Sequence, residues 1–208
     1  MIFQLNDELI FPNPALAEQD GLLALGGDLS PERLMLAYQN GIFPWYNEDT
    51  PILWYSPHER FVLLPEEIKI SKSMRQIIHS QKFKITFNTA FKAVIQACAE
   101  MKRNHQDGTW ITQDMQQAYI RLHELGFAHS IEVWQNKELV GGLYGVLVKQ
   151  IFCGESMFSK QSNTSKLALI WLCQNVNIQL IDCQIHSEHL EKLGAKMISR
   201  AEFMRYLS

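Results

Sequence analysis

The stretch CGESMFSKQSNTSK, residues 153–166, concentrates groups that could do chemistry: one glutamate, four serines and a threonine. Its G-E-S-M-F portion has the outline of a nucleophile elbow, in which a serine attacks an ester or an amide. That motif needs a small residue where Phe158 stands, because the strand must turn sharply into its helix. We therefore favour a structural role over nucleophilic attack by Ser156. The polar side chains nearer the next helix are expected to cap it: Ser162, Asn163, Thr164 and Ser165.

A second candidate is the triplet Asp182-Cys183-Gln184 at the end of an apolar run that predicts a strand. Side chains alternate along a strand, so Asp182 and Gln184 are expected on the same face. There they could orient a reacting amine, or they could simply cap the helix that follows. His186 and His189 continue a ligand-like spacing from Cys183, but a set that crosses from strand into helix makes a poor tetrahedral site. We expect no metal.

A meander followed by a helix and another strand also suggests an acetyl-CoA N-acyltransferase of the GNAT type. Such an enzyme holds the pyrophosphate of CoA on a glycine-rich turn at a helix start, and the turn SKQSNTSK, residues 159–166, has no glycine. The segment GGLYG, residues 141–145, lacks the third glycine of a dinucleotide fingerprint and lies in a predicted hairpin. Close backbone packing or close substrate approach explains these glycines better. We expect no cofactor.

The elements that must position these residues alternate between helix and strand, which is the pattern of an α/β or an α+β fold, and we expect α+β. Ser30 and Pro31 read as the cap and first position of a helix that Gly41 ends. Asn136 and Lys137 read as the turn of a hairpin. We expect a small N-terminal domain over residues 1–62 and a larger domain over residues 63–208. In the larger domain, helices are predicted over 73–81, 89–103, 114–126 and 163–177, and strands over 82–88, 129–135, 138–148, 151–158 and 180–185.

Composition limits the class of protein. With 208 residues, of which 47% are hydrophobic, the chain can bury a substantial core. No stretch approaches the roughly 18 apolar residues of a membrane span, and the four cysteines form no C-x-x-C pair. We expect a cytoplasmic monomer with no membrane partner.

The charge is unevenly placed. The net charge is −3, yet residues 68–99 carry six cations and no acid. This segment could bind the phosphates of a nucleic acid, in which case the affinity would fall steeply with salt; alternatively, it is a solvated helix face. The cations are Lys69, Lys72, Arg75, Lys82, Lys84 and Lys92.

Eight blocks, in order, resemble the signature blocks of the bacterial leucyl/phenylalanyl-tRNA–protein transferase family. They are GLLALGGDLSPERL, NGIFPW, WYSPHER, DGTWIT, AHSIEVW, LVGGLYGV, FCGESMFS and DCQ. The resemblance implies two domains, the larger with the GNAT fold, and neither CoA nor metal. It also implies the reaction: Leu or Phe, and less readily Met, passes from its tRNA to the N-terminal amine of a protein that begins with Lys or Arg. The product is marked for degradation through the N-end rule.

The implied reaction does not need the nucleophile or the cofactor site that the sequence lacks. An aminoacyl ester is already activated, so its attack by an amine needs no ATP and no protein nucleophile. Orientation alone can supply roughly 7 to 11 kcal/mol, and an α-amine with a pKa of about 7.7 to 8 is partly neutral near pH 7. The resemblance implies that Gln184 contacts the amine or the ester oxygen. It also implies that Asp182 orients the Gln184 amide and stabilises positive charge on the amine. It places Glu155 in the active site, and we assign Glu155 to the cationic acceptor side chain; a structural carboxylate is the alternative.

Two binding regions follow from the same resemblance. Trp45 and Trp110 would stack on the terminal adenine of the tRNA, where base stacking is worth about 1 to 3 kcal/mol; interdomain packing is the alternative. An apolar pocket for the donor side chain would be formed by Leu143, Met157, Leu169, Leu172, Val176 and Ile181, each of which would otherwise count as core. The competing functions are a CoA-dependent N-acyltransferase and a noncatalytic tRNA-binding protein.

Overall fold

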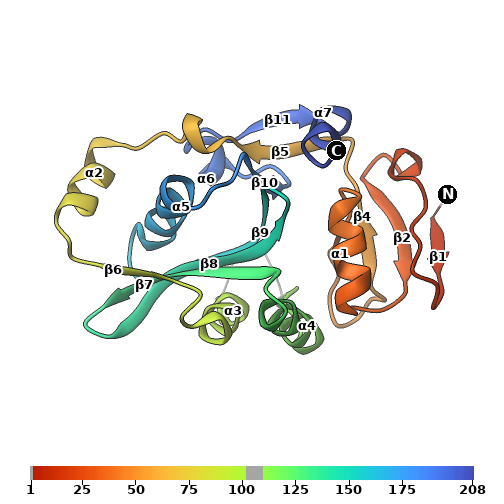
Figure 1. Cartoon of the computed structure of the whole chain (residues 1–208), viewed down its shortest axis with the longest axis horizontal. Helices are drawn as coiled ribbons and strands as arrows, with labels where there is room; N and C mark the ends of the chain where they lie inside the picture. The colour runs from red at the N-terminus through yellow and green to blue at the C-terminus, as the bar shows by residue number, and fades with distance from the viewer. Residues whose placement is uncertain (1, 102–109) are drawn as a thin grey trace.

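Two sheets of different size organise the chain (Figure 1). The structure is a computed structural model, and it describes residues 2–101 and 110–208. Residues 107–109 of the DGTWIT block and the end of the helix expected over 89–103 lie outside the described residues. The described elements give the α+β fold that the sequence predicts.

The smaller sheet belongs to the N-terminal part of the chain. Its strand order is β1-β2-β4-β3, with β1 at Phe3–Leu5, β2 at Leu22–Gly26, β4 at Leu53–Tyr55 and β3 at Phe43–Pro44. The 3₁₀ helix η1 covers Pro14–Leu16, and helix α1 covers Pro31–Gln39. Helix α1 lies between this sheet and the larger unit, where it contacts β3, β8 and α4 (Figure 1).

The larger sheet has the order β11-β5-β10-β9-β8-β7-β6. Its strands are β11 at Lys196–Ser199, β5 at Glu59–Leu63, β10 at Leu180–Gln184, β9 at Ile151–Ser159, β8 at Glu138–Val148, β7 at Ala128–Gln135 and β6 at Lys84–Phe87. Neighbouring strands are antiparallel except β9 and β10, which run parallel and are joined by helix α5, Thr164–Asn175. This β9-α5-β10 crossover in an otherwise antiparallel sheet matches the meander, helix and strand from which the sequence analysis expected a GNAT-type fold.

Helices cover both faces of the larger sheet. Helix α5 packs on one face, and helices α3, Phe91–Glu100, and α4, Gln113–Glu124, pack on the other (Figure 1). The remaining helices are α2 at Lys72–His79, η2 at Pro65–Glu67, α6 at Glu188–Glu191 and α7 at Arg200–Tyr206. The chain passes from the smaller sheet to the larger sheet between Tyr55 and Glu59. The domain boundary expected after residue 62 therefore falls inside β5.

Local signals placed several element ends correctly. The Ser30 hydroxyl accepts a hydrogen bond from the Arg33 amide at 3.3 Å, and Gly41 has φ +67°, as expected for the start and stop of α1. Asn136 and Lys137 have φ values of 50° and 69°, which is the backbone of a two-residue hairpin turn. The hairpin between β7 and β8 is therefore confirmed.

The start of helix α5 corrects one expectation. Its N-cap residue Asn163 makes no side-chain cap hydrogen bond. The Ser165 amide instead donates to the hydroxyl of Ser159, on strand β9, at 2.9 Å. Thr164 is fully buried, and its hydroxyl donates to the Val140 carbonyl at 2.9 Å, so this side chain ties the helix to β8.

The glycines of GGLYG bring backbones close together, as proposed from sequence. A Cβ on Gly145 would lie 2.3 Å from the Cys153 carbonyl oxygen, and a Cβ on Gly142 would lie 2.6 Å from the Ile131 carbonyl oxygen. These distances are shorter than any ordinary contact, so β8 can pack here only with glycine. The segment is a strand interior and does not start a helix.

Candidate active site

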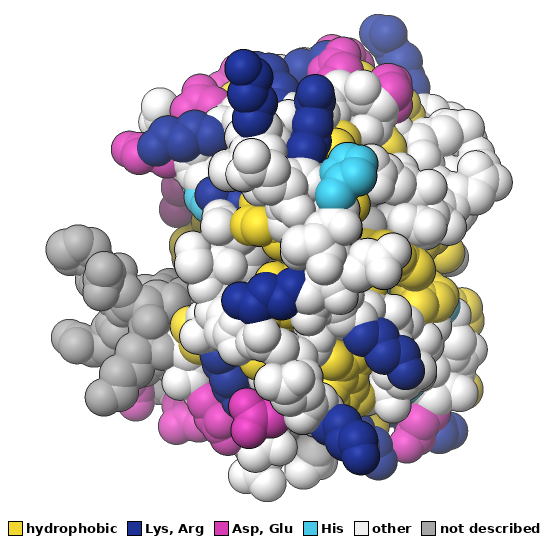
Figure 2. Space-filling view, turned by 90° about the vertical axis from the view of Figure 1, so that its left-hand side faces the viewer, with side chains coloured by type: hydrophobic (Ala, Val, Ile, Leu, Met, Phe, Trp, Pro, Cys, Tyr) yellow, Lys and Arg dark blue, Asp and Glu magenta, His cyan; other side chains and the backbone are white. Residues whose placement is uncertain are grey.

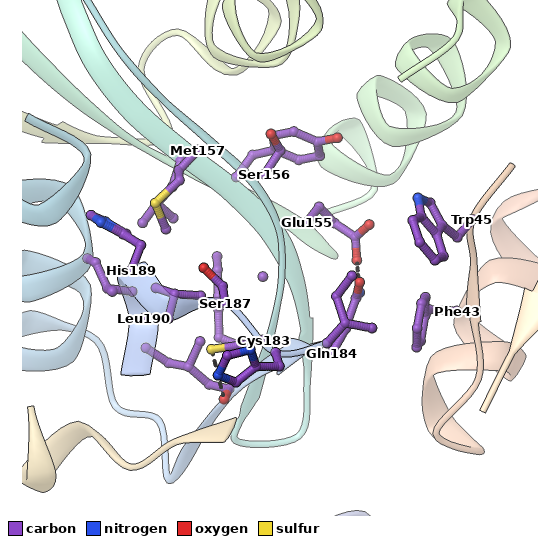
Figure 3. A pocket seen from close by; sticks show the side chains of 18 of the residues that line it. Phe43, Trp45, Glu155, Ser156, Met157, Cys183, Gln184, Ser187, His189 and Leu190 are labelled. Atoms are coloured by element: carbon purple, nitrogen blue, oxygen red, sulfur yellow. Dashed lines mark hydrogen bonds between the residues drawn. The ribbon is translucent and has the colours of Figure 1, made fainter. Parts of the chain in front are cut away.

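A cavity of about 350 Å³ opens where the N-terminal unit meets β9, β10 and the segment after β10. At one end, Trp45 and Phe43 from the N-terminal unit face Glu155 and Gln184 (Figure 3). At the other end lie Met157 and side chains from the segment that contains α6, among them His189 and Leu190 (Figure 3). The cavity therefore has a rim with aromatic rings, a polar middle and an apolar far end.

Glu155 lies in the middle of this cavity and is only 8% exposed. The Tyr38 hydroxyl donates to its Oε1 at 2.8 Å, and the Tyr119 hydroxyl donates to its Oε2 at 3.0 Å. The Gln184 side-chain amide also donates to Oε1, at 2.9 Å. Burial raises the pKa of Glu155 to about 7, against the lowering effect of these hydrogen bonds.

Tyr38 and Tyr119 are functional candidates that the sequence analysis missed. Both are fully buried, and their hydroxyl oxygens also lie in contact with each other. Tyr38 comes from α1 and Tyr119 from α4, so each reads in sequence as one more apolar residue on a helix face. Nothing in the local sequence signals that both hydroxyls reach one carboxylate on β9.

Asp182 is the member of the expected pair that does not line the cavity. It is 0% exposed and is absent from the cavity wall, whereas Cys183 and Gln184 line the cavity. The register of β10 shifts between Asp182 and Gln184, and Gln184 has φ +65°. Gln184 contacts Glu155 from this irregular backbone, whereas the Asp182 side chain is buried, so only Gln184 of the expected pair lines the cavity.

The partner of Asp182 is Arg60, which the sequence analysis did not single out. Two hydrogen bonds of 2.9 and 2.8 Å join the Arg60 guanidinium to the two oxygens of Asp182. The guanidinium also donates to the Gly41 carbonyl at 3.0 Å and lies 4.7 and 4.6 Å from the ring centres of Phe43 and Phe203. This cluster joins the N-terminal unit, β5, β10 and α7.

Asp182 acts on Gln184 through the backbone. Its Oδ1 accepts a hydrogen bond from the Gln184 amide N–H at 2.9 Å. That contact fixes the left-handed backbone from which the Gln184 side chain projects. The expected contact between Asp182 and the side-chain amide is absent among the described contacts, where Glu155 takes that place.

The expected apolar pocket is assembled in part. Leu143, Met157, Leu169 and Ile181 line the cavity. Leu172 is fully buried in the second core cluster, and Val176 packs at the margin of that cluster; neither lines the cavity. Phe152, Cys183 and Leu190 complete the apolar wall and were not predicted.

Both expected tryptophans line the cavity. Trp45 is 37% exposed, and its ring centre lies 5.6 Å from that of Tyr55. Trp110 is half-buried and packs against the core. Phe43 lies beside Trp45 in the cavity wall and was not predicted (Figure 3). Aromatic faces are therefore available at the rim for a planar group such as a base.

The Cys183 thiol is a poor nucleophile, and the possible metal ligands among the described residues are poorly placed. Burial raises the pKa of the Cys183 thiol far above its ordinary value, which keeps it protonated. Among residues 2–101 and 110–208, no group of three or more His, Cys, Asp or Glu side chains is arranged to hold a metal ion. Within the same ranges, no helix has the length and apolarity that crossing a bilayer requires.

Five of the six expected phosphate-binding cations surround α2 and β6: Lys69, Lys72, Arg75, Lys82 and Lys84. Lys137, in the β7–β8 turn, borders the same hollow as Lys82 and Lys84 and was not predicted. On this side of the molecule, blue cationic side chains are spread over the surface, whereas magenta acidic ones lie toward its margins (Figure 2). Lys92 lies apart on α3, 4.0 Å from Glu124.

Comparison with known proteins identifies the family. Residues 62–208 match the family model "Leucyl/phenylalanyl-tRNA protein transferase", and residues 27–58 match the model of its N-terminal domain. The chain is 54% identical over 210 residues to the leucyl/phenylalanyl-tRNA–protein transferase of Syntrophobacter fumaroxidans, covering 100% of this chain and 90% of that protein. It is also 54% identical over 206 residues to that of Flavobacterium psychrophilum, covering 98% of each.

One solved structure adds a likeness of fold alone. A conserved protein of unknown function from Bacteroides thetaiotaomicron aligns with a TM-score of 0.50 and 11% identity, over 65% of this chain and 53% of that one. A GCN5-related N-acetyltransferase from Kribbella flavida aligns with a TM-score of 0.37 and 8% identity, over 77% and 58%. The sequence identity over the whole chain and the match to both family models show that this protein belongs to the leucyl/phenylalanyl-tRNA–protein transferase family.

Proposed function

We propose that this protein transfers leucine or phenylalanine, and less readily methionine, from aminoacyl-tRNA to the N-terminal amine of proteins that begin with Lys or Arg. The reaction takes place in the cytoplasm, involves a monomer without metal or cofactor, and marks the product for degradation. One observation carries the proposal: a single cavity has aromatic rings at its rim, an apolar far end, and a buried carboxylate–amide pair between them. An aminoacyl-adenosine has the same three parts in the same order.

The donor would occupy the cavity along its length. Adenine would stack on Trp45 and Trp110 at the rim, and the Leu or Phe side chain would lie against Leu143, Met157 and Ile181. The thioether of Met157 adapts to both a branched and an aromatic side chain. In this placement the ester lies near Gln184, between the two ends.

Gln184 is then the group that meets the attacking amine. Its Nε2 donates to Glu155, so its Oε1 is the atom left to accept a hydrogen bond in the cavity. A neutral amine that donates one N–H to this oxygen is held with its lone pair free to attack the ester carbon. Loss of the amine proton and protonation of the departing ribose oxygen complete the aminolysis. No covalent bond to the protein is needed, and the gain comes from orientation.

Glu155 is better assigned to Gln184 than to the acceptor cation. Both of its oxygens already accept hydrogen bonds from inside the protein. Asp182, paired with Arg60, likewise positions Gln184 through its backbone. We therefore propose Gln184 as the catalytic residue that touches substrate, with Asp182 and Glu155 holding it in place.

The cationic face around α2 and β6 would contact the phosphates of the tRNA body without reading bases. Replacing Lys72 and Arg75 by Ala should raise the KM for every donor tRNA and flatten the dependence of KM on salt, because counterions are released from fewer phosphate contacts. Lys92→Ala, on a different helix and beside Glu124, is the matched control. An unchanged salt slope in the double variant would place the tRNA body elsewhere.

The direct test is incubation with leucyl-tRNA and a peptide that begins with Arg, followed by mass spectrometry. We expect the peptide mass to increase by one leucine residue, and we expect no change for a peptide whose N-terminal amine is acetylated. Gln184→Ala should slow the transfer strongly. Acetyl-CoA supplied in place of charged tRNA separates this function from that of a CoA-dependent acyltransferase. Acetylation without leucine transfer would overturn the proposal.

A further inference from the structure

The two buried tyrosines behind the cavity have a geometry that packing alone does not require. Tyr38 and Tyr119 lie 81 residues apart in the sequence and on different helices, yet their hydroxyls meet each other. Each also reaches one oxygen of Glu155, at 2.8 and 3.0 Å. Two phenylalanines would fill almost the same volume without placing polar atoms in the core. The hydroxyls therefore serve Glu155.

The tyrosines affect Gln184 because Glu155 and Gln184 share a hydrogen bond. An ionised carboxylate only accepts hydrogen bonds, so the amide group next to it must be the NH₂ group, and the Gln184 oxygen must point away. A protonated Glu155 can donate, which allows the amide to turn and to present NH₂ to the cavity. The orientation of Gln184 thus depends on whether Glu155 is ionised.

Other charged or titratable groups near Glu155 do not replace this pair. Asp182, on β10, disfavours ionisation of Glu155, but Arg60, on β5, neutralises it through two hydrogen bonds. On β9, burial raises the pKa of the Cys153 thiol, so that thiol stays neutral. On β8, the Tyr144 ring packs edge-on against that of Tyr119, with ring centres 5.7 Å apart. Among the described contacts of the carboxylate, only the two phenols and Gln184 donate to it.

We propose that Tyr38 and Tyr119 are positioning residues for aminoacyl transfer, which hold Glu155 ionised so that the Gln184 oxygen faces the acceptor amine. The proposal rests on the proposed function of this cavity. It also gives the N-terminal unit a part in the reaction, because Tyr38 belongs to α1. Neither tyrosine lines the cavity, so neither is expected to touch substrate.

The test uses Tyr38→Phe and Tyr119→Phe in the full chain, with Tyr206→Phe as a control that removes a phenol oxygen outside the described hydrogen bonds of Glu155. Each variant loses one hydrogen bond to a charged group, and this loss should lower kcat roughly 10- to 100-fold. The KM for aminoacyl-tRNA should change less than about twofold, since no donor contact is lost. In a plot of kcat against pH, the rising limb should move to higher pH, because a carboxylate with fewer hydrogen-bond donors around it is harder to ionise.

A double-mutant cycle separates positioning from folding. In a Gln184→Ala background, either Tyr→Phe change should cost little more, because the residue through which it acts is gone. A purely structural role predicts a lower melting temperature, an unmoved pH limb and effects that add to those of Gln184→Ala. Additive effects, an unmoved pH limb, or full activity of Gln184→Ala alone would each overturn the proposal.

A measurement without substrate keeps this test independent of the proposed function. The pKa of Glu155 can be followed by the ¹³C NMR signal of its carboxyl carbon, assigned with Glu155→Gln. We expect a higher pKa in both Tyr→Phe variants than in the parent and no change in Tyr206→Phe. A parent that fails to transfer leucine would refute the proposed function, whereas an unchanged carboxyl pKa in both Tyr→Phe variants would refute the role of the tyrosines.

Discussion

Replacing Asp182 by Asn tests whether this residue acts mainly by pairing with buried Arg60 or by stabilising charge on the substrate amine. The change keeps the shape of the side chain but removes its charge. The guanidinium of Arg60 is 1% exposed, and two of its nitrogens bond to Asp182 at 2.9 and 2.8 Å. Asp182→Asn would therefore leave a buried cation without its counter-ion.

The expected loss of stability is large. Breaking a buried ion pair by removing one partner costs about 3 to 5 kcal/mol. For a chain of this size, 1 kcal/mol corresponds to roughly 2 to 4 °C in melting temperature. The melting temperature of Asp182→Asn should thus fall by about 6 to 20 °C. Transfer by the remaining folded protein should fall as well, since the Gln184 backbone loses its carboxylate partner.

Two comparisons make the assay specific. Glu67→Gln breaks an exposed pair with Lys196 of 2.7 Å and should cost less than about 1 kcal/mol. The double change Arg60→Met with Asp182→Leu removes both charges and should recover most of the stability. It should not recover transfer. Calorimetry on the four proteins measures the melting temperatures, and the mass-spectrometric assay measures transfer.

The reasoning fails if Asp182→Asn melts within about 2 °C of the parent. An unchanged melting temperature together with lost transfer would instead favour the role expected from sequence, a carboxylate that stabilises charge on the amine. A variant that melts early yet transfers normally below its melting temperature would separate the Arg60 pair from the positioning of Gln184.

Three further predictions concern the cavity and its support. Trp45→Ala and Trp110→Ala should weaken binding of a minimal aminoacyl-adenosine as much as binding of the full aminoacyl-tRNA, by about 1 to 3 kcal/mol in a titration; a loss confined to the full tRNA would exclude stacking on the terminal adenine. Glu155→Gln should lower kcat/KM for Arg-starting and Ala-starting peptides by the same factor, whereas a selective loss with Arg-starting peptides would return Glu155 to the acceptor cation. Glu132, fully buried, accepts hydrogen bonds from the Thr86, Thr89 and Ser130 hydroxyls and from the Ala90 amide at the start of α3. Glu132→Ala should cost roughly 2 to 4 kcal/mol in urea unfolding, because a cap is lost and buried donors are left unpaired; a cost below about 1 kcal/mol would contradict this.

The sequence predicted what is encoded locally. Helix α1 is capped by Ser30 and stopped by Gly41, and the turn at Asn136 and Lys137 has the backbone expected of a tight hairpin. Such signals depend on a few neighbouring residues, so they can be read without tertiary structure. Strand β11, Lys196–Ser199, was missed because it has only four residues, of which only Ile198 is buried.

The register of β10 could not be predicted in the same way. Strict alternation predicts that Asp182 and Gln184 share one face, but the register shifts between them, and of the two only Gln184 lines the cavity. Asp182 is buried and pairs with Arg60, a residue 122 positions away in the chain. This ion pair joins strands β5 and β10, and no pattern within β10 shows it.

Long-range contacts are also the reason why we now assign Glu155 to Gln184 and not to the acceptor cation. A glutamate beside a cavity that receives a cation suggests an ion pair, and from β9 alone this is a reasonable inference. The contacts that favour the other assignment come from Tyr38, 117 residues earlier, and Tyr119, 36 residues earlier, which reach the carboxylate from two separate helices. Desolvation by these helices raises the pKa of Glu155 to about 7, and the hydroxyls partly offset that effect. Because the carboxylate is both buried and already hydrogen-bonded, an incoming cation would have to displace an internal donor to reach it. The structure therefore favours a reaction in which the charge on Glu155 acts on the substrate only through the Gln184 amide.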